Sequence, residues 1–172
     1  LKQIHWKMSS KRNQLIVKEA SLPTTKSLLL FWDKNTGETN AEEMDAMAEV
    51  ASSVAQAISE QGIPFCLGWT EGKTCIYEDI ENDDELLQTI PRIVKAGADN
   101  SSSSGANMCS QMAESADFSK VIYFAKQMPD DFQQIGSGDM TLVLCSETAD
   151  NRWRTYTYKS DTYQEDLHTI EL

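Results

Sequence analysis

Leu28-Leu29-Leu30-Phe31-Trp32 is an uninterrupted run of large apolar residues, and Asp33 ends it. Such a run is typical of a strand that is covered on both faces, as in a parallel sheet. The polar residues 34–39 that follow are expected to form a loop. A strand of this kind needs packed layers on both sides, which favours an α/β domain for the 172-residue chain.

The segment after this loop has the pattern of a helix. Asn40 can cap its first turn, and Glu43, three residues later, can complete a capping box. Apolar residues then recur at helical spacing between positions 44 and 58, and Gly62 supplies the stop. We therefore expect a helix between Asn40 and Gly62.

Two strand-like segments follow this helix. Residues 63–69 and 74–80 flank Glu71-Gly72, a turn-forming pair. The arrangement predicts a hairpin, which places at least one antiparallel strand in the sheet.

A second helix is expected after the hairpin, with Asp83 or Asp84 as its cap, a kink or a split at Pro91, and an end at Gly97. The remaining elements are expected as helices at 108–116, 129–135 and 161–170 and strands at 120–125, 140–145 and 154–158. Together the segments predict a three-layer, Rossmann-like domain with a mostly parallel sheet and helices on both faces.

The charge of the chain is distributed unevenly. The chain has 15 Lys and Arg residues and 27 Asp and Glu residues, which gives a net charge of −12. Residues 1–26 carry six bases and one acid, or +5, so residues 27–172 carry nine bases and 26 acids, or −17. The acidic balance argues against a general nucleic-acid binder, because it would repel a phosphate backbone. We divide the chain into a basic arm, residues 1–26, with one short strand near residues 14–18, and an α/β domain, residues 27–172.

No apolar run approaches the ~20 residues that span a bilayer. The chain begins at Leu1 without an initiating Met, and we expect it to be part of a longer protein. Its four cysteines form no CxxC pair, which favours free thiols in a reducing compartment.

The arm carries a recognisable motif, Leu1-Lys-Gln-Ile-His-Trp-Lys-Met-Ser-Ser-Lys-Arg-Asn-Gln-Leu-Ile-Val-Lys-Glu19. It resembles the signature of the bacterial domain of unknown function 58 family. The matching residues are Ile4, His5, Trp6, Lys7, Ser9, Ser10, Arg12, Leu15, Val17, Lys18 and Glu19. His5 and Trp6 can form a recognition pair or pack on the edge of a sheet.

The resemblance implies a domain similar to the von Willebrand factor A fold. Members of that family are typically membrane-anchored through an amino-terminal transmembrane hairpin. Many are encoded beside MoxR-type AAA+ ATPases and are associated with assembly or maturation. The resemblance thus implies the cytoplasmic face of the cell membrane, a missing upstream anchor and a MoxR-type ATPase as protein partner.

In competent von Willebrand A domains, a D-x-S-x-S loop binds Mg²⁺ through hard oxygen ligands. The matching residues here are Asp33-Lys34-Asn35-Thr36-Gly37, and Gly37 has no side chain to offer. Lys126 stands where the family has a further Asp. We expect a degenerate metal site, with at most Asp33 and Asn35 as ligands, Lys126 in the charge role of the metal, and no bound cofactor. Alternatively, Asp33 simply caps a loop or a helix dipole.

Enzyme motifs are absent: the sequence has no Walker A, HExxH or G-x-G-x-x-G pattern. The alternative function is phosphoryl transfer of the haloacid-dehalogenase type, with Asp33 as nucleophile, because Asp33-Lys-Asn-Thr-Gly is similar to the Asp-Lys-Thr-Gly loop of those enzymes. Asn35 breaks the register of that motif, and the second acid of those enzymes is absent.

In parallel sheets, ligands bind at the carboxyl ends of the strands. We therefore expect a non-enzymatic protein-interaction domain that contacts its partner there, through Asp33, Asn35, Thr36, Thr70, Lys126 and Glu147. The acidic run from Glu78 to Glu85 is either a solvated face or a surface that meets a basic partner or the chain's own arm.

Overall fold

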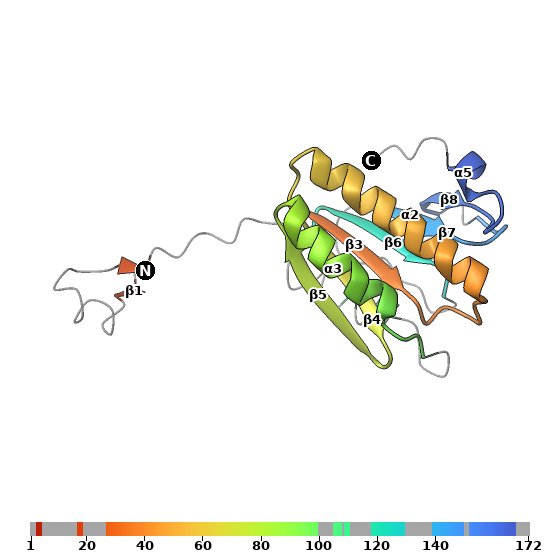
Figure 1. Ribbon diagram of the computed structural model, residues 1–172, viewed down its shortest axis with the longest axis horizontal. Helices are drawn as coiled ribbons and strands as arrows, with labels where there is room; N and C mark the ends of the chain where they lie inside the picture. Colours follow the sequence, from red (N-terminus) through yellow and green to blue (C-terminus); the bar gives the residue numbers. More distant parts are fainter. Residues whose placement is uncertain are drawn as a thin grey trace.

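The computed structural model describes residues 3–4, 17–18, 27–99, 105–107, 109–110, 118–129, 139–149 and 152–167, and the structural statements below concern these residues. From residue 27 onward they form an α/β unit around a six-stranded sheet (Figure 1).

The strand order of the sheet is β5-β4-β3-β6-β7-β8. The apolar run quoted above is β3 (Leu28–Asp33), which pairs in parallel with β4 (Phe65–Glu71) on one side and with β6 (Lys120–Ala125) on the other. β7 (Asp139–Leu144) and β8 (Arg154–Thr157) continue the parallel order. β5 (Thr74–Ile80) pairs antiparallel with β4 at the edge, so the predicted hairpin is confirmed.

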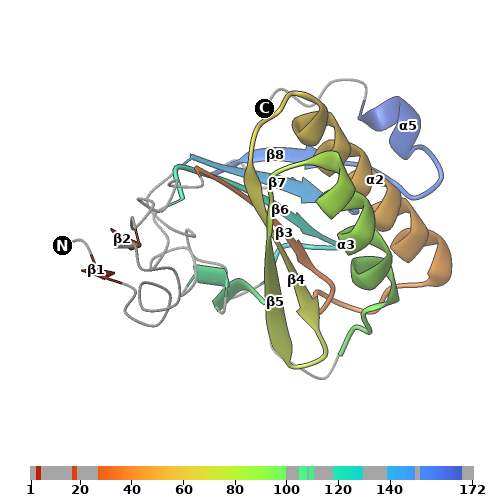
Figure 2. The same ribbon diagram turned by 60° about the vertical axis from the view of Figure 1, so that its left-hand side comes forward.

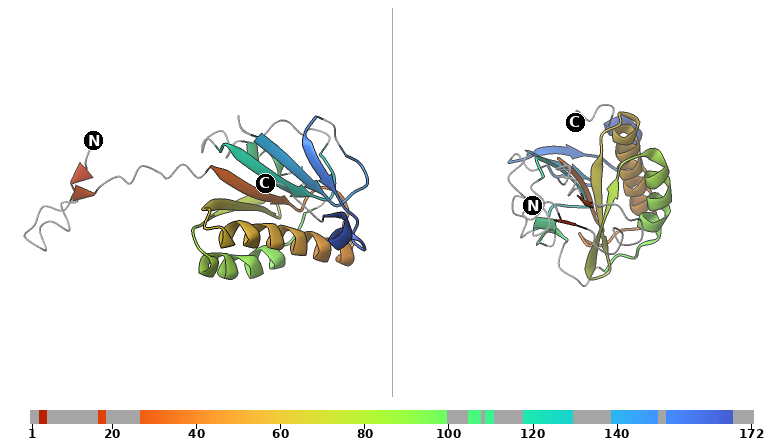
Figure 3. Two further views of the ribbon diagram at one scale, coloured as in Figure 1. Left: turned by 90° about the horizontal axis from the view of Figure 1, so that it is seen from above. Right: turned by 90° about the vertical axis from the view of Figure 1, so that its left-hand side faces the viewer.

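Two helices lie side by side on one face of the sheet, α2 (Ala41–Glu60) and α3 (Asp83–Lys95) (Figure 3). The capping box of Asn40 and Glu43 is present at the start of α2. The predicted caps of α3, Asp83 or Asp84, are wrong, because the cap is Asn82, whose side chain accepts the hydrogen bond from the Glu85 amide.

The expected split at Pro91 does not occur, and α3 runs through it as one helix. Proline removes the amide that would bond the Leu87 carbonyl. Leu87 and Pro91 are both exposed, so water can satisfy that carbonyl.

Hydrophobic residues cover both faces of the sheet. Leu28, Leu30 and Trp32 of β3 pack in the cluster beneath α2 and α3, whereas Leu29 and Phe31 pack in a second cluster on the opposite face. Ala106 and Cys109, from the helical residues 106–107 and 109–110, belong to that second cluster. Burial on both faces explains why β3 is apolar throughout and is consistent with a three-layer, Rossmann-like fold.

Near the amino end, β1 (Gln3–Ile4) and β2 (Val17–Lys18) pair as a separate antiparallel sheet. Lys18 is the one charged residue of the family signature among the described positions; His5, Trp6, Lys7, Arg12 and Glu19 lie outside them. Most of the helices expected at 108–116 and 129–135 also lies outside. The last described helix, α5 (Tyr163–Asp166), lies within the predicted segment 161–170, of which residues 168–170 lie outside the described residues.

Candidate functional site

The parallel strands all end at the same edge of the sheet (Figure 2). The loop after β3, residues 34–39, lies there beside the end of β4 and the residues that follow β6. The structure thus brings Asp33, Asn35, Thr36, Thr70 and Lys126 together, in the place predicted from the sequence.

The carboxylate of Asp33 is the centre of this edge, and its side chain is fully buried. The backbone amide of Asn35 donates a hydrogen bond to Asp33 Oδ1 at 2.9 Å, which closes the turn after β3. Oδ2 accepts from the Gly105 amide at 2.6 Å and from the phenol of Tyr123, on the neighbouring strand β6. Donors from three segments of the chain therefore hold this carboxylate in place.

Gly105 begins a helical turn, because its carbonyl accepts from the Cys109 amide at 2.8 Å. Asp33 thus places a carboxylate at the amino end of that turn, where negative charge is favourable. A Cβ on Gly105 would lie 2.4 Å from Cγ2 of Thr70 and 3.1 Å from the ring of Phe31. Glycine allows the close approach that this hydrogen bond requires.

The next loop residues connect further segments. Asn35 donates through Nδ2 to the Gly72 carbonyl at 2.8 Å and accepts from the Asp99 amide at 2.9 Å. Thr36 accepts at Oγ1 from the Lys126 amide at 3.0 Å. The side chains of Asn35 and Thr36 are 5% and 4% exposed, so both serve the interior of the edge rather than its surface.

Lys34 is buried, with 1% exposure. Its amide donates to Thr70 Oγ1 at 2.7 Å, and its ammonium donates to the carbonyls of Ile93 and Ala96 at the end of α3. The ammonium also lies 4.4 Å from the centroid of the Trp32 ring. Burial lowers the pKa of Lys34 to about 8. This lysine caps the helix, since cations favour helix carboxyl ends.

Lys126 and Glu147 are the accessible members of the predicted set. The Lys126 ammonium, whose side chain is 23% exposed, bonds Glu43 Oε2 at 2.7 Å and the Glu38 carbonyl. This hydrogen bond lowers the pKa of Glu43. Glu147 forms an ion pair with Lys159 at 2.7 Å. The Lys126 ammonium therefore joins the loop after β3 to α2. The sequence had suggested a different role, in which Lys126 replaces the positive charge of a metal beside Asp33.

These contacts bear on a metal ligand set. Both Asp33 oxygens accept hydrogen bonds from the chain, and the Asn35 amide oxygen is bound to the Asp99 amide. Asp33 is 0% exposed and Asn35 is 5% exposed, so a divalent ion could reach their oxygens only if the loops moved, and the two residues fit it poorly in this conformation. Among the described residues, no group of three or more His, Cys, Asp or Glu side chains could hold a metal.

The burial of Asp33 also bears on its proposed alternative role as a phosphoryl nucleophile. Attack on phosphorus requires an accessible carboxylate oxygen. Asp33 is 0% exposed and is held by the Tyr123 phenol and two amides.

The partly buried Cys75 and the buried Cys109 and Tyr123 pack in the hydrophobic cluster on this face of the sheet, near Asp33. Burial and, to a smaller extent, the nearby Asp33 charge together raise the pKa of Cys75 to about 11. The same causes raise the pKa of Cys109 and of Tyr123. All four cysteines are free. Raised thiol pKa values make these groups poor nucleophiles near neutral pH.

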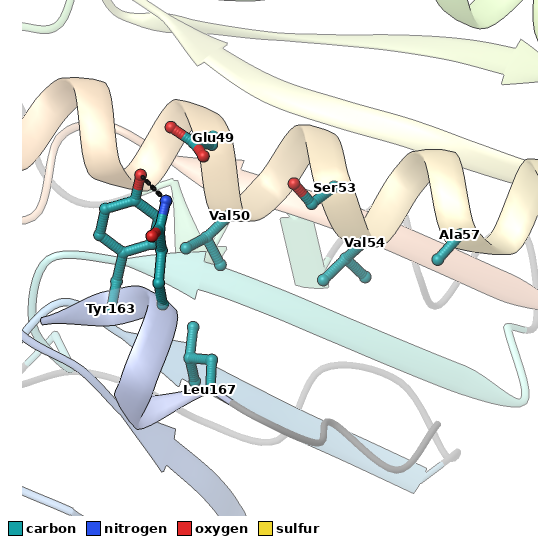
Figure 4. Close-up of a pocket in the computed structure, with 8 residues that line it drawn as sticks. Glu49, Val50, Ser53, Val54, Ala57, Tyr163 and Leu167 are labelled. Carbon is teal, nitrogen blue, oxygen red and sulfur yellow. Dashed lines mark hydrogen bonds between the residues drawn. The ribbon is translucent and has the colours of Figure 1, made fainter.

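A separate groove lies between α2 and α5, with a volume of about 390 Å³ (Figure 4). None of the residues singled out from the sequence lines it. Its walls are Glu49, Val50, Ser53, Val54, Ala57, Tyr163, Gln164 and Leu167.

Sequence reasoning missed three parts of the edge: Lys34, Tyr123 and Gly105. Tyr123 carried one signal, a polar group within the otherwise apolar run of β6. Lys34 carried none, because a lysine in a polar loop is expected to be solvated.

No model of a known protein family matches the sequence, and no curated protein or solved structure matches it significantly. Within the part of the chain that the structure describes, every helix is too short or too polar to cross a bilayer.

Proposed function

We propose that this chain is a non-enzymatic protein-interaction domain of the von Willebrand A type. On the resemblance of its arm, we place it at the cytoplasmic face of a bacterial membrane, with a MoxR-type ATPase as partner in assembly or maturation.

The proposal rests on one observation: the Asp33 carboxylate is buried and accepts hydrogen bonds from within the domain. Asp33 and Thr70 are 0% exposed, and Asn35 and Thr36 are nearly so. Buried, hydrogen-bonded side chains rigidify the loops that contain them. In this proposal the four residues position the loops, and a partner does not touch their side chains.

Direct recognition then belongs to the exposed rim of the same edge. The Lys126–Glu43 pair is partly accessible, and the side chains of Glu147 and Lys159 are 75% and 57% exposed. Rim charges of this kind affect the rate and specificity of association more than its strength.

The test is capture of the MoxR-type ATPase from the host bacterium, with the tagged full chain as bait and mass spectrometry as readout. Lys126→Glu should abolish capture. Because this change also places two acids side by side, a second variant, Lys126→Glu with Glu43→Lys, restores the ion pair in reverse orientation.

If the rim charge is recognised, the restored pair is stable but still does not capture the ATPase. Recovery of capture by the restored pair would show that Lys126 only stabilises the loop and would contradict a rim contact. Lys120→Glu, at the opposite end of β6, is the matched control and should leave capture unchanged.

The phosphoryl-transfer alternative has its own assay. We expect no turnover of p-nitrophenyl phosphate with Mg²⁺ present. Turnover that disappears in Asp33→Asn would replace the interaction proposal with the enzyme.

A further inference from the structure

β5 is the outermost strand on one side of the sheet (Figure 1). Among the strands that the structure describes, β4 is its one neighbour. β5 contains no proline or glycine, and its pairing with β4 runs without a bulge from Glu71 and Thr74 to Phe65 and Ile80. Residues 74–79 are exposed or half-buried. An edge strand of this kind is a template for pairing with another chain, so β5 is a candidate interaction surface.

The regular pairing with β4 identifies the residues of β5 that direct their backbone outward. A turn of two residues separates the paired Glu71 and Thr74, so this pair is the hydrogen-bonded pair that closes the hairpin. Bonded and non-bonded pairs alternate along an antiparallel ladder. Cys75, Tyr77 and Asp79 therefore direct their backbone N–H and C=O groups away from β4. A strand that joins the sheet at β5 would bond to these three residues.

The charges around β5 match those of a second copy of the same strand. The exposed Lys73 precedes β5, and the exposed Asp79 lies near its other end. When two copies of β5 pair antiparallel with Ile76 at the twofold axis, Lys73 of each copy lies across from Asp79 of the other. This register therefore forms two ion pairs. It also places Cys75 across from Tyr77, so that outward-facing backbone groups meet.

Other registers of the same two strands are less favourable. With Tyr77 at the axis, Ile76 would lie across from Glu78. With Glu78 at the axis, the two Glu78 side chains would lie opposite each other, where like charges repel. In the register centred on Ile76, Glu78 lies across from Thr74 instead. The charge of Glu78 is also balanced by an ion pair with Arg92 of its own chain.

We propose that two copies of this chain associate through β5 and form one continuous sheet, with Ile76 at the twofold axis. The contact is isologous, so it closes as a dimer. Backbone hydrogen bonds supply the attraction, and the pairs of Lys73 with Asp79 fix the register. The interface is built from different residues than the rim around Lys126, so either proposal can fail without the other.

The test is sedimentation velocity of the full chain at about 1–500 µM, the range of a weak dimer. A salt concentration of about 0.3 M screens the repulsion between two copies that each carry a net charge of −12. We expect an equilibrium between monomer and dimer across this range. A chain that stays monomeric throughout would overturn the proposal.

An exchange of charges tests the two ion pairs. Lys73→Asp and Asp79→Lys each place like charges across from each other at both ends of the interface, so each should weaken the dimer at least about fivefold. An equimolar mixture of these two variants restores opposite charges at both ends, and a heterodimer should form. The controls are Asp45→Lys on α2 and Lys120→Asp at the start of β6, which should dimerise as the unmodified chain does. Equal weakening by the controls, or no recovery in the mixture, would overturn the proposal.

A cysteine at the axis tests the register. The Cα atoms of a non-bonded antiparallel pair lie about 4.5 Å apart, within reach of a disulfide. In a Cys75→Ser background, Ile76→Cys should form a covalent dimer on oxidation with diamide, because position 76 lies across from itself. Thr74→Cys in the same background is the control, since position 74 lies about 13 Å from its counterpart. Crosslinking of Thr74→Cys but not of Ile76→Cys would contradict the proposed interface.

The chain's own arm is the competing occupant of β5. A dimer that appears only after Lys7, Lys11 and Arg12 are changed to Gln would show that the arm covers this strand, and would overturn the assignment to a second copy. Far-UV circular dichroism of each variant separates loss of association from loss of fold.

Discussion

The phenol of Tyr123 donates a hydrogen bond to the carboxylate of Asp33 across two central parallel strands, and both side chains are fully buried. Two amides donate to the same carboxylate. The residue that would carry metal or phosphoryl chemistry in related motifs is thus tied into the interior of this domain.

Tyr123→Phe removes one donor from a buried carboxylate and leaves the packing of the ring in place. A hydrogen bond to a charged group contributes about 1.5–3 kcal/mol to stability, and Oδ2 keeps its bond from Gly105 in this variant. We expect the free energy of unfolding in urea to fall by about this amount. Tyr156→Phe, on the edge strand β8, is the control. Equal free energies of unfolding for Tyr123→Phe and the unmodified chain would show that this hydrogen bond does not stabilise the fold.

Gly105→Ala should destabilise the domain by about 1–3 kcal/mol, because its Cβ would overlap a buried methyl group of Thr70. Thr70→Ser deletes that methyl group and keeps the hydroxyl that accepts from Lys34. The double variant should therefore recover part of the loss. Gly97→Ala, with nothing within 4 Å of its Cβ, is the control. Strictly additive losses in the double variant would contradict the close approach of Gly105 to Thr70.

Lys34 should make the fold relatively more stable as pH rises from about 8 to 10.5. Below pH 8 both states hold the ammonium; within this window the unfolded chain keeps a proton that the folded chain has released, so raising the pH favours folding. The measurement is the pH dependence of the difference in unfolding free energy between the unmodified chain and Lys34→Met. A difference that is flat across this window, or that falls, would contradict the burial of the ammonium.

Cys75 should make the fold less stable as the pH rises, which is the opposite of the effect expected for Lys34. Its pKa rises from 9.0 to about 11 on folding, so between these values the folded chain keeps a proton that the unfolded chain loses. Stability from this thiol is complete below pH 9 and is lost as the pH rises toward 11. Cys75→Ala should therefore lose less stability than the unmodified chain over this range. Parallel pH profiles would show that the thiol is solvated in the folded state.

The sequence predicted local structure well where one segment contains the whole signal. The capping box of Asn40 and Glu43 and the hairpin around Gly72 are both determined by neighbouring residues. The cap of α3 was misplaced because Asn82, Asp83 and Asp84 can all cap a helix, and the choice depends on where β5 ends.

The sequence predicted where the candidate site residues lie but not that most of them are buried. The rule of strand carboxyl ends placed Asp33, Asn35, Thr36, Thr70 and Lys126 at one edge, where the structure has them. The buried state of Asp33 depends on residues distant in sequence, Gly105 and Tyr123, which no local pattern linked to it. Lys34 shows the same limit, since its partners are carbonyls at the end of α3, 59 and 62 residues away.

We infer that the Asp33 carboxylate belongs to the fold and is not a metal ligand. Isothermal titration calorimetry of the full chain with Mg²⁺ and with Mn²⁺ tests it most directly. We predict no saturable binding at micromolar concentrations, and the same result for Asp33→Ala wherever that variant remains folded. Micromolar binding of either ion by the unmodified chain, lost in Asp33→Ala, would contradict the claim and restore the metal site.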